Sequence, residues 1–164
     1  MSKLDIIKKK ICTTEQLQAN LNIWRLLGKK IVFTNGCFDL LHLGHIDYLS
    51  KAADLGDKLV IGLNSDASAS ALKGPGRPIT DQVSRSLMLA SFSFVDAVIL
   101  FDEPTPLELI RRVRPNILVK GADYTIEQIV GADLVLQNGG QVKTIEYLPG
   151  YSTTLIEKKI RSTS

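Results

Sequence analysis

The sequence has few residues of the kinds that build metal centres and disulfide frameworks. Its 164 residues contain two cysteines and two histidines. Two cysteines in a chain of this length do not make a disulfide framework, so a reducing, cytoplasmic environment is expected. No apolar run is long enough to span a bilayer, and the lysines near the N-terminus are not followed by the apolar core of a signal peptide. We therefore expect neither a membrane span nor secretion.

The charge balance is also modest. The formal net charge is +3, which is too small to indicate a nucleic-acid surface. The basic run at 8–10 is interpreted as a solvated terminal segment. Length and an apolar content of 45% are typical of one globular domain. We expect a single domain over 1–164, with an N-terminal extension and helix at 1–28 and a core at 29–164.

Short apolar runs alternate with segments of helical periodicity, and no repeat, low-complexity stretch or linker interrupts them. Strands are predicted at 31–33, 59–63, 95–101, 116–119 and 141–145, and helices at 13–28, 41–56, 81–94, 106–113, 126–131 and from 154 onward. Apolar strands separated by helices indicate a parallel sheet that is covered on both faces. Because the crossovers in such sheets are right-handed, a doubly wound α/β fold is predicted.

Both histidines lie in one short stretch, GCFDLLHLGH, which directly follows the first predicted strand. In open α/β sheets, ligands bind beyond the carboxyl ends of the strands. His42 and His45 are three residues apart at the start of a predicted helix, whose first N–H groups and dipole attract anions. Gly36 permits close approach of the backbone. The stretch therefore predicts an anion site at which two imidazoles donate hydrogen bonds to phosphate oxygens.

This stretch has two other interpretations. A zinc site needs three or four ligands, and only Cys37 and Asp39 lie near the histidines, so phosphate contact is preferred to metal ligation. For Gly44, a packing role and a functional role remain equally open from spacing alone. Neither the P-loop pattern nor the complete G-x-G-x-x-G pattern is present, which indicates another class of phosphate site.

The stretch resembles the HxGH motif of the nucleotidyltransferase superfamily, in its cytidylyltransferase-like branch. GYSTT at 150–154 resembles the serine–threonine motif that opens the last helix of that family, and the stretches 62–66, 73–79 and 119–124 also match. The set is most similar to the bacterial adenylyltransferase domain that makes ADP-heptose for the lipopolysaccharide core. In that family the domain often follows a sugar kinase, so this chain is expected to be a free-standing form.

The resemblance implies a Rossmann-like nucleotidyltransferase fold that joins D-glycero-D-manno-heptose 1-phosphate to ATP with release of pyrophosphate. It also implies Mg²⁺ as the companion of ATP, with no protein ligand to the metal identified, and a homodimer. By motif position it assigns catalysis to His42, His45 and Lys73, nucleotide binding to Gly36, Cys37, Phe38, Asp39, Gly44, Gly121, Asp123, Tyr124, Ser152, Thr153 and Thr154, and sugar-phosphate binding to Asp66, Arg77 and Arg85.

Without the resemblance, several of these residues have simpler interpretations. Lys73 is then better interpreted as a solvated loop lysine. Arg85 is equally a residue of a solvated helix face, and an ordinary turn competes closely with ligand binding at 123–124. Cytidylyl members carry an arginine where this chain has Tyr147, which argues against CTP. The alternatives are a cytidylyltransferase for glycerol 3-phosphate or a related alcohol phosphate, a non-catalytic nucleotide-binding module, and a subunit that only scaffolds a sugar kinase.

Overall fold

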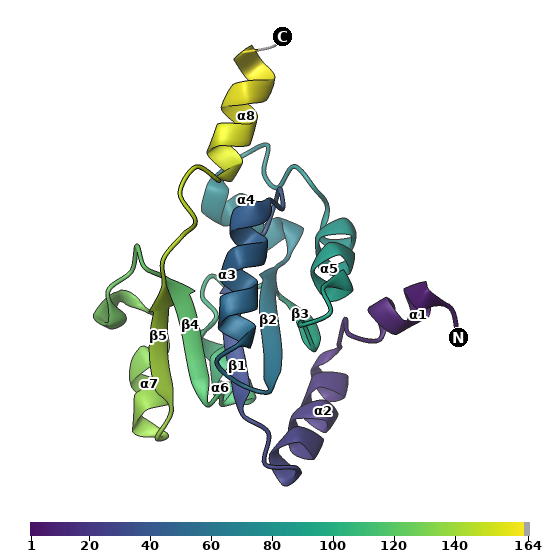
Figure 1. Cartoon of the computed structure of the whole chain (residues 1–164), viewed down its shortest axis with the longest axis vertical. Coiled ribbons are helices and arrows are strands. Elements are labelled where there is room, and N and C mark those ends of the chain that lie inside the picture. Colours follow the sequence, from purple (N-terminus) through teal and green to yellow (C-terminus); the bar gives the residue numbers. More distant parts are fainter. Residues whose placement is uncertain (163–164) are drawn as a thin grey trace.

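A five-stranded parallel sheet organises the chain in the computed structural model, which describes residues 1–162 (Figure 1). The strands are β1 (Ile31–Gly36), β2 (Lys58–Asn64), β3 (Ala97–Phe101), β4 (Ile117–Gly121) and β5 (Gln141–Ile145). Their order is β3-β2-β1-β4-β5, so the chain moves outward from β1 to β3 and then returns to place β4 beside β1. The predicted doubly wound α/β fold is confirmed, and the strand order reverses between β1 and β4.

Alternate side chains of each strand enter two separate apolar layers, because successive residues of a strand point to opposite faces. Ile31 and Phe33 of β1 belong to one layer, and Val32 belongs to the other. Helices α2 (Thr14–Leu26), α6 (Leu107–Val113) and α7 (Ala132–Gln137) cover the first face, and α3 (Leu43–Ala53) and α5 (Gln82–Ser91) cover the second. Both faces of the sheet are therefore buried, as the uninterrupted apolar strands predicted.

Several short elements differ from the expected ones. The helices α1 (Lys3–Lys8), α4 (Asp66–Lys73) and α7 were not predicted, while α8 (Thr153–Ser162) was. The first three are six to eight residues long, too short for a clear apolar period. The helix expected at 126–131 is one 3₁₀ turn, η1 (Ile126–Gln128), and α7 begins only after Gly131, whose φ is 82°.

The N-terminal extension covers the free edge of β3. Ile11 forms a parallel bridge with Val98, and the Cys12 N–H donates to the Val98 carbonyl at 2.8 Å. Lys10 Nζ donates to the Phe92 carbonyl at 2.9 Å, so this end of the basic run is attached to the domain and is not solvated as expected. Covering the edge in this way removes unpaired backbone groups that could pair with another chain.

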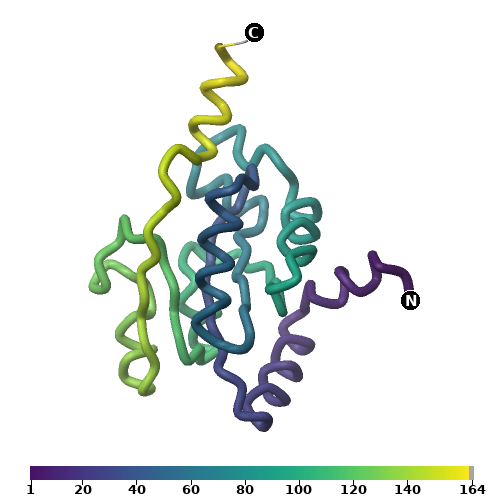
Figure 2. The backbone as a smooth tube through the Cα atoms, in the orientation of Figure 1, coloured from purple at the N-terminus to yellow at the C-terminus, as the bar shows by residue number. Residues whose placement is uncertain are grey.

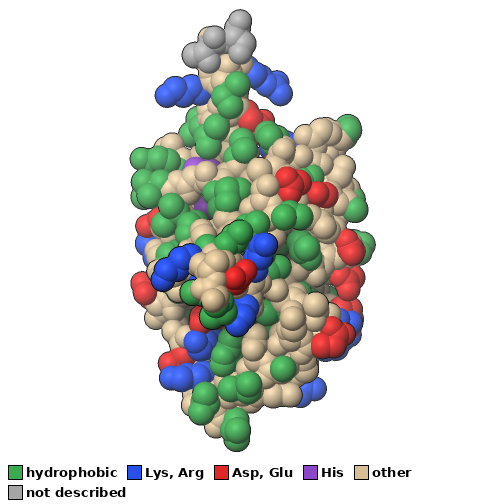
Figure 3. Space-filling view, turned by 90° about the vertical axis from the view of Figure 1, so that its right-hand side faces the viewer, with side chains coloured by type: hydrophobic (Ala, Val, Ile, Leu, Met, Phe, Trp, Pro, Cys, Tyr) green, Lys and Arg blue, Asp and Glu red, His purple; other side chains and the backbone are tan. Residues whose placement is uncertain are grey.

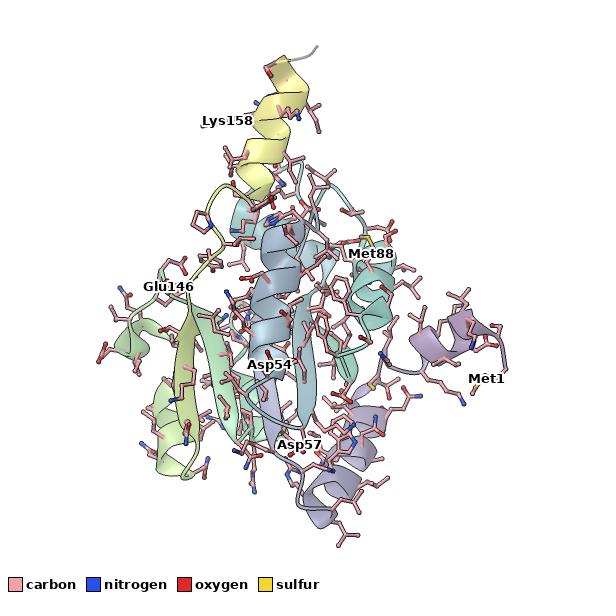
Figure 4. The ribbon with its side chains drawn as sticks, in the orientation of Figure 1. Met1, Asp54, Asp57, Met88, Glu146 and Lys158 are labelled. Atoms are coloured by element: carbon pink, nitrogen blue, oxygen red, sulfur yellow. The ribbon has the colours of Figure 1, made fainter. Side chains whose placement is uncertain are left out.

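The carboxyl ends of the strands lie toward α8, which projects from the body at the top of the view (Figures 1 and 2). Asp54 and Asp57, between α3 and β2, mark the opposite end of the sheet from Lys158 on α8 (Figure 4). Within residues 1–162, no helix has the length and apolar character needed to cross a membrane. The foot of α8 is thus the end of the molecule at which a ligand of such a sheet is expected.

Candidate active site

A cavity of about 560 Å³ opens at the carboxyl ends of β1 and β4, where the strand order reverses. Twelve of the predicted site residues line it: Gly36, Cys37, Phe38, Asp39, His45, Lys73, Arg77, Gly121, Asp123, Tyr124, Thr153 and Thr154. The remaining lining residues are Asn35, Tyr48, Asn64, Leu72, Pro78, Lys120 and Tyr147. The predicted residues His42, Gly44, Asp66, Arg85 and Ser152 do not line it. Segments far apart in the sequence therefore meet around one hollow.

The two histidines form a single unit at the start of α3. The backbone N–H of His42 donates to Nδ1 of His45 at 3.3 Å, and the two ring centroids are 3.9 Å apart. The Phe38 ring meets His45 edge-on, with centroids 5.6 Å apart. Histidine atoms reach the surface at the foot of the projecting C-terminal helix (Figure 3). The turn after β1 thus holds His45 in one orientation, with its neighbour stacked against it.

Gly44 has an identifiable packing role. A Cβ at this position would lie 3.0 Å from the ring of His42 and 3.3 Å from Cβ of Tyr151. A side chain here would push the His42 ring or the segment before α8 away from the turn. The question left open from spacing is therefore answered in part, because the glycine lets the imidazole and the C-terminal segment approach the turn closely.

Both imidazoles are neutral at neutral pH. Burial, helped by the nearby His42, lowers the pKa of His45 to about 4, and burial also lowers the pKa of His42. Because Nδ1 of His45 accepts a hydrogen bond, its single ring proton is assigned to Nε2. A neutral imidazole that donates from Nε2 can bind a phosphate oxygen without first releasing a proton. Nδ1 of His42 is buried and has no partner among the described residues.

Asp39 organises the loop that faces it. Its carboxylate accepts hydrogen bonds from the N–H groups of Ile79 and Thr80, at 2.8–2.9 Å, and from Arg77 at 3.0 Å. Burial by itself raises the pKa of Asp39, but the donors of Thr80, Ile79 and Arg77 outweigh it and lower that pKa. The carboxylate thus holds loop 74–80 over the cavity, a task that the motif position did not indicate.

Arg77 connects that loop to α8. Besides its bond to Asp39, its guanidinium donates to the carboxylate of Glu157. The side chains of Arg77 and Glu157 are about three-quarters buried. A residue expected to bind sugar phosphate therefore has both ends of its guanidinium engaged by carboxylates, and it fastens the C-terminal helix beside the cavity.

Arg85 lies beneath the cavity, and the expectation that it faces the sugar phosphate is corrected. Its side chain is 0% exposed, and the guanidinium donates to the carbonyls of Cys37, Asn64 and Thr80 at 2.6–2.9 Å. The same group pairs with Asp66 at 2.7 Å. Buried charge of this kind is tolerated when every donor is satisfied. Arg85 thus connects the turns after β1 and β2 from below. Its ion pair with Asp66 also engages the carboxylate that was expected to bind the sugar phosphate.

The other wall of the cavity is formed after β4 and β5. The Tyr147 hydroxyl lies directly against Gly121, where no Cβ would fit. Burial and then the nearby Asp123 raise the pKa of Tyr147 to about 12, so the phenol remains protonated. Asp123, Tyr124 and Tyr147 line the cavity together. This wall offers a carboxylate, a phenol and an aromatic face to a polar ring or sugar.

The residues of the serine–threonine motif have two different positions in the structure. The Leu155 N–H donates to Oγ of Ser152 at 3.1 Å, so Ser152 caps α8. Thr153 and Thr154 line the cavity at the first turn of that helix. Lys73, the last residue of α4, lies on the opposite rim and is exposed. The rim therefore carries a cation and two hydroxyls above the histidine turn.

A metal ion has no ready-made cage here. Among residues 1–162, no group of three or more histidine, cysteine, aspartate or glutamate side chains is placed to hold a metal. The carboxylate of Asp39 is already bound to Arg77 and to loop N–H groups. These residues fit Mg²⁺ that is held chiefly by phosphate oxygens of a nucleotide, because Mg²⁺ commonly keeps several waters and few protein ligands.

The sequence alone does not place five polar lining residues at the site: Asn35, Tyr48, Asn64, Lys120 and Tyr147. For Lys120 a signal was available, since a lysine closes an otherwise apolar strand at the carboxyl edge of the sheet. Tyr48 is buried on α3 and bonds Thr34 at 2.8 Å, so its place under the cavity depends on tertiary packing. In the sequence, Tyr147 is notable only because it occupies the position at which cytidylyl members carry arginine.

Comparisons with known proteins agree with this geometry. Residues 33–159 match the model of the Cytidylyltransferase-like family. The chain is 52% identical over 153 residues to the bifunctional protein HldE of Methylobacillus flagellatus, covering 93% of this chain and 31% of that protein. It therefore spans about a third of the length of the curated relatives that it matches.

Two solved structures are similar as well. A lipopolysaccharide core biosynthesis protein from Thermoplasma volcanium has a TM-score of 0.60 and 32% identity, covering 74% of this chain and 98% of that one. Pantoate-beta-alanine ligase from Francisella tularensis has a TM-score of 0.61 over 92% of this chain and 76% of that one; at 16% identity it shows the fold alone. With its histidine turn at the strand reversal and its family match, the chain belongs to the Cytidylyltransferase-like family.

Proposed function

We propose that this chain is an adenylyltransferase that converts D-glycero-D-manno-heptose 1-phosphate and ATP to ADP-heptose and pyrophosphate. The observation that carries the proposal is the neutral His42–His45 unit at the start of α3, where His45 faces a cavity at the strand reversal. The names of two similar proteins, HldE and a lipopolysaccharide core biosynthesis protein, support the choice of sugar.

The reaction does not need a strong general base, because the attacking oxygen belongs to a phosphate and is already anionic. In the step, that oxygen forms a bond to the α-phosphorus of ATP while the bond from the same phosphorus to the pyrophosphate oxygen breaks. The task of the protein is to hold two polyanions in line and to neutralise the charge that collects on the leaving group. The cavity offers His45, Lys73 and the N–H groups of the α3 start for that purpose.

Each wall of the cavity can be assigned a portion of the nucleotide. We assign the triphosphate to the histidine turn with Thr153 and Thr154, and the ribose and base to the wall of Asp123 and Tyr124. Mg²⁺, when bound, adds charge neutralisation on the phosphate oxygens. Because Arg77 and Arg85 are engaged by carboxylates, we assign them to positioning the loop and the turns rather than to contact with the sugar phosphate.

The test is release of pyrophosphate in the presence of Mg²⁺. ATP or CTP is paired with either anomer of D-glycero-D-manno-heptose 1-phosphate or with glycerol 3-phosphate. We expect release only with ATP and one heptose phosphate. Release with CTP and glycerol 3-phosphate would support the cytidylyltransferase alternative, and ATP binding without release from any pair would support the non-catalytic module. The reaction is assigned to the cytoplasm, where ATP is available, and the homodimer stays a prediction for sedimentation analysis.

A further inference from the structure

A lysine to which no role has yet been assigned, Lys120, lies on the floor of the cavity. Lys120 is the fourth residue of β4, and three buried residues precede it in the strand. Its Nζ donates to the backbone carbonyl of Asn35 at 3.2 Å and lies 5.9 Å from the centre of the Tyr124 ring. The side chain therefore spans the strand reversal, from β4 to the end of β1, and lines the cavity.

Its charge is not matched in the way that the other inner cations are matched. Arg77 is bound by the carboxylates of Asp39 and Glu157, and Arg85 by that of Asp66. Lys73 lies on the exposed rim. Within residues 1–162, no ion pair joins Lys120 to a carboxylate. A partly buried ammonium that contacts a carbonyl and a ring but has no carboxylate within ion-pair distance is costly, unless an anion completes its surroundings.

We propose that Lys120 is a phosphate-binding catalytic residue, which holds a reacting phosphate against the floor of the cavity while His45 holds it from the α3 side. The inference rests on the proposed function and extends it to a residue on the other half of the sheet. The ligand chemistry is a phosphate oxygen, which either the nucleotide or the sugar phosphate supplies. An ammonium on a four-carbon stem suits this task, because it can follow a phosphate as charge shifts during transfer.

The groups around the ammonium make its charge sensitive to pH. Burial lowers the pKa of Lys120 to about 8, although Asp123 and Cys37 partly oppose the shift. Burial raises the pKa of the Cys37 thiol, and the pKa of Tyr147 beside Asp123 is about 12, so neither group ionises near pH 8. A lysine is charged below its pKa. The contribution of Lys120 to phosphate binding by the free protein should therefore be fully present well below pH 8 and be lost as the pH rises through 8.

The experiment compares Lys120→Met, Lys120→Arg and the control Lys143→Met. Lys143 lies one strand away on β5 and is exposed, so its loss removes an equal charge outside the cavity. We expect Lys120→Met to lower kcat/KM about 10- to 100-fold, with Lys120→Arg recovering part of the loss and Lys143→Met close to wild type. A raised KM for ATP would identify the nucleotide as the source of the phosphate, and a raised KM for the sugar phosphate would identify the other substrate.

The pH profile separates this role from a structural one. In the wild-type protein, kcat/KM should fall about tenfold per pH unit above pH ~8. In Lys120→Arg that limb should move to higher pH, and in Lys120→Met it should disappear. Wild-type kinetics together with an unchanged alkaline limb in Lys120→Met would overturn the proposal, and so would equal losses in Lys120→Met and Lys143→Met.

A binding measurement keeps the inference separate from the proposed function. Calorimetric titration with MgATP and, separately, with inorganic pyrophosphate needs no turnover. If the wild-type protein binds either ligand but transfers nothing, the proposed function fails. Lys120 is then judged by whether Lys120→Met weakens that binding at pH 7 more than at pH 9. Unfolding curves of each variant identify any variant that does not fold. If Lys120→Met does not fold, the proposal is tested by the alkaline limb of kcat/KM in the wild type and by its shift to higher pH in Lys120→Arg.

Discussion

His45 shows how neighbouring residues determine the chemistry of a single side chain. Its Nδ1 accepts the His42 N–H, and the Phe38 ring limits its rotation. Burial lowers its pKa to about 4, so the ring stays neutral through the range in which an exposed histidine would titrate. The imidazole is therefore a fixed hydrogen-bond donor and not a proton acceptor in the proposed reaction.

This assignment predicts an unequal effect of His45→Ala on turnover and binding. We expect kcat to fall about 10²-fold or more, because a donor that acts mainly on transition-state charge is lost. The dissociation constant for MgATP should change much less. Steady-state kinetics and calorimetry measure the two quantities. His45→Gln, which restores an N–H donor at a similar reach, should lie between the wild type and the alanine variant, and wild-type turnover of His45→Ala would remove the proposed role.

At the scale of elements, one arginine connects loop 74–80 to α8. Arg77 reaches Asp39 at the turn after β1 and Glu157 on α8, which otherwise projects from the body (Figure 1). None of the residues of α8 within the described range is buried. The ion pair of Arg77 and Glu157 therefore contributes to holding Thr153 and Thr154 over the cavity, since no described residue of α8 is deeply buried.

Removing the ion pair between Arg77 and Glu157 should increase the local opening of α8 without unfolding the domain. In Glu157→Gln we expect the amides at the start of α8 to exchange about fivefold faster, which corresponds to about 1 kcal/mol for a partly exposed pair. KM for ATP should rise as well. The matched control is Glu108→Gln, which breaks an exposed pair with Arg111 inside α6. Hydrogen exchange measured by mass spectrometry gives the comparison, and equal exchange in both variants would contradict the assignment.

At the scale of the whole molecule, the cavity joins the two halves of the sheet. Asn35 and Cys37 come from the end of β1, Lys120 and Gly121 from the end of β4, and Thr154 from α8. A ligand that fills the cavity must contact all of these segments at once. Its binding free energy therefore adds to the free energy of unfolding, because an unfolded chain does not assemble the site.

Saturating MgATP should accordingly raise the melting temperature. At a ligand concentration about 100 times the dissociation constant, the added stability is about 2.7 kcal/mol. For a domain of this size that corresponds to a rise of about 5–10 °C. Adenosine at the same concentration should give a much smaller rise, because it lacks the phosphates that we assign to His42, His45 and Lys73. Differential scanning calorimetry measures both, and equal shifts would argue against a triphosphate site.

The order of the elements and the place of the site could be read from local pattern. Short apolar runs such as 31–33 and 59–63 indicate buried strands without any tertiary information, and the stretch with the two histidines comes after the first of them. Parallel strands bring their carboxyl ends to one edge, so the histidine turn had to lie there. Short helices such as α4 and α7 were not predicted, because six to eight residues are too few to show a clear helical period of apolar residues.

The roles of the charged residues depended on contacts between distant segments. Arg85 was expected at the sugar phosphate, but it is buried under the turns because the carbonyls of Cys37 and Asn64 converge there. Lys120, 85 residues after Asn35, reaches the cavity because β4 pairs beside β1. A lysine or arginine has the same local pattern whether it faces water, a carboxylate or a ligand. Only the packing of the strand ends and loops determines which of these surrounds it.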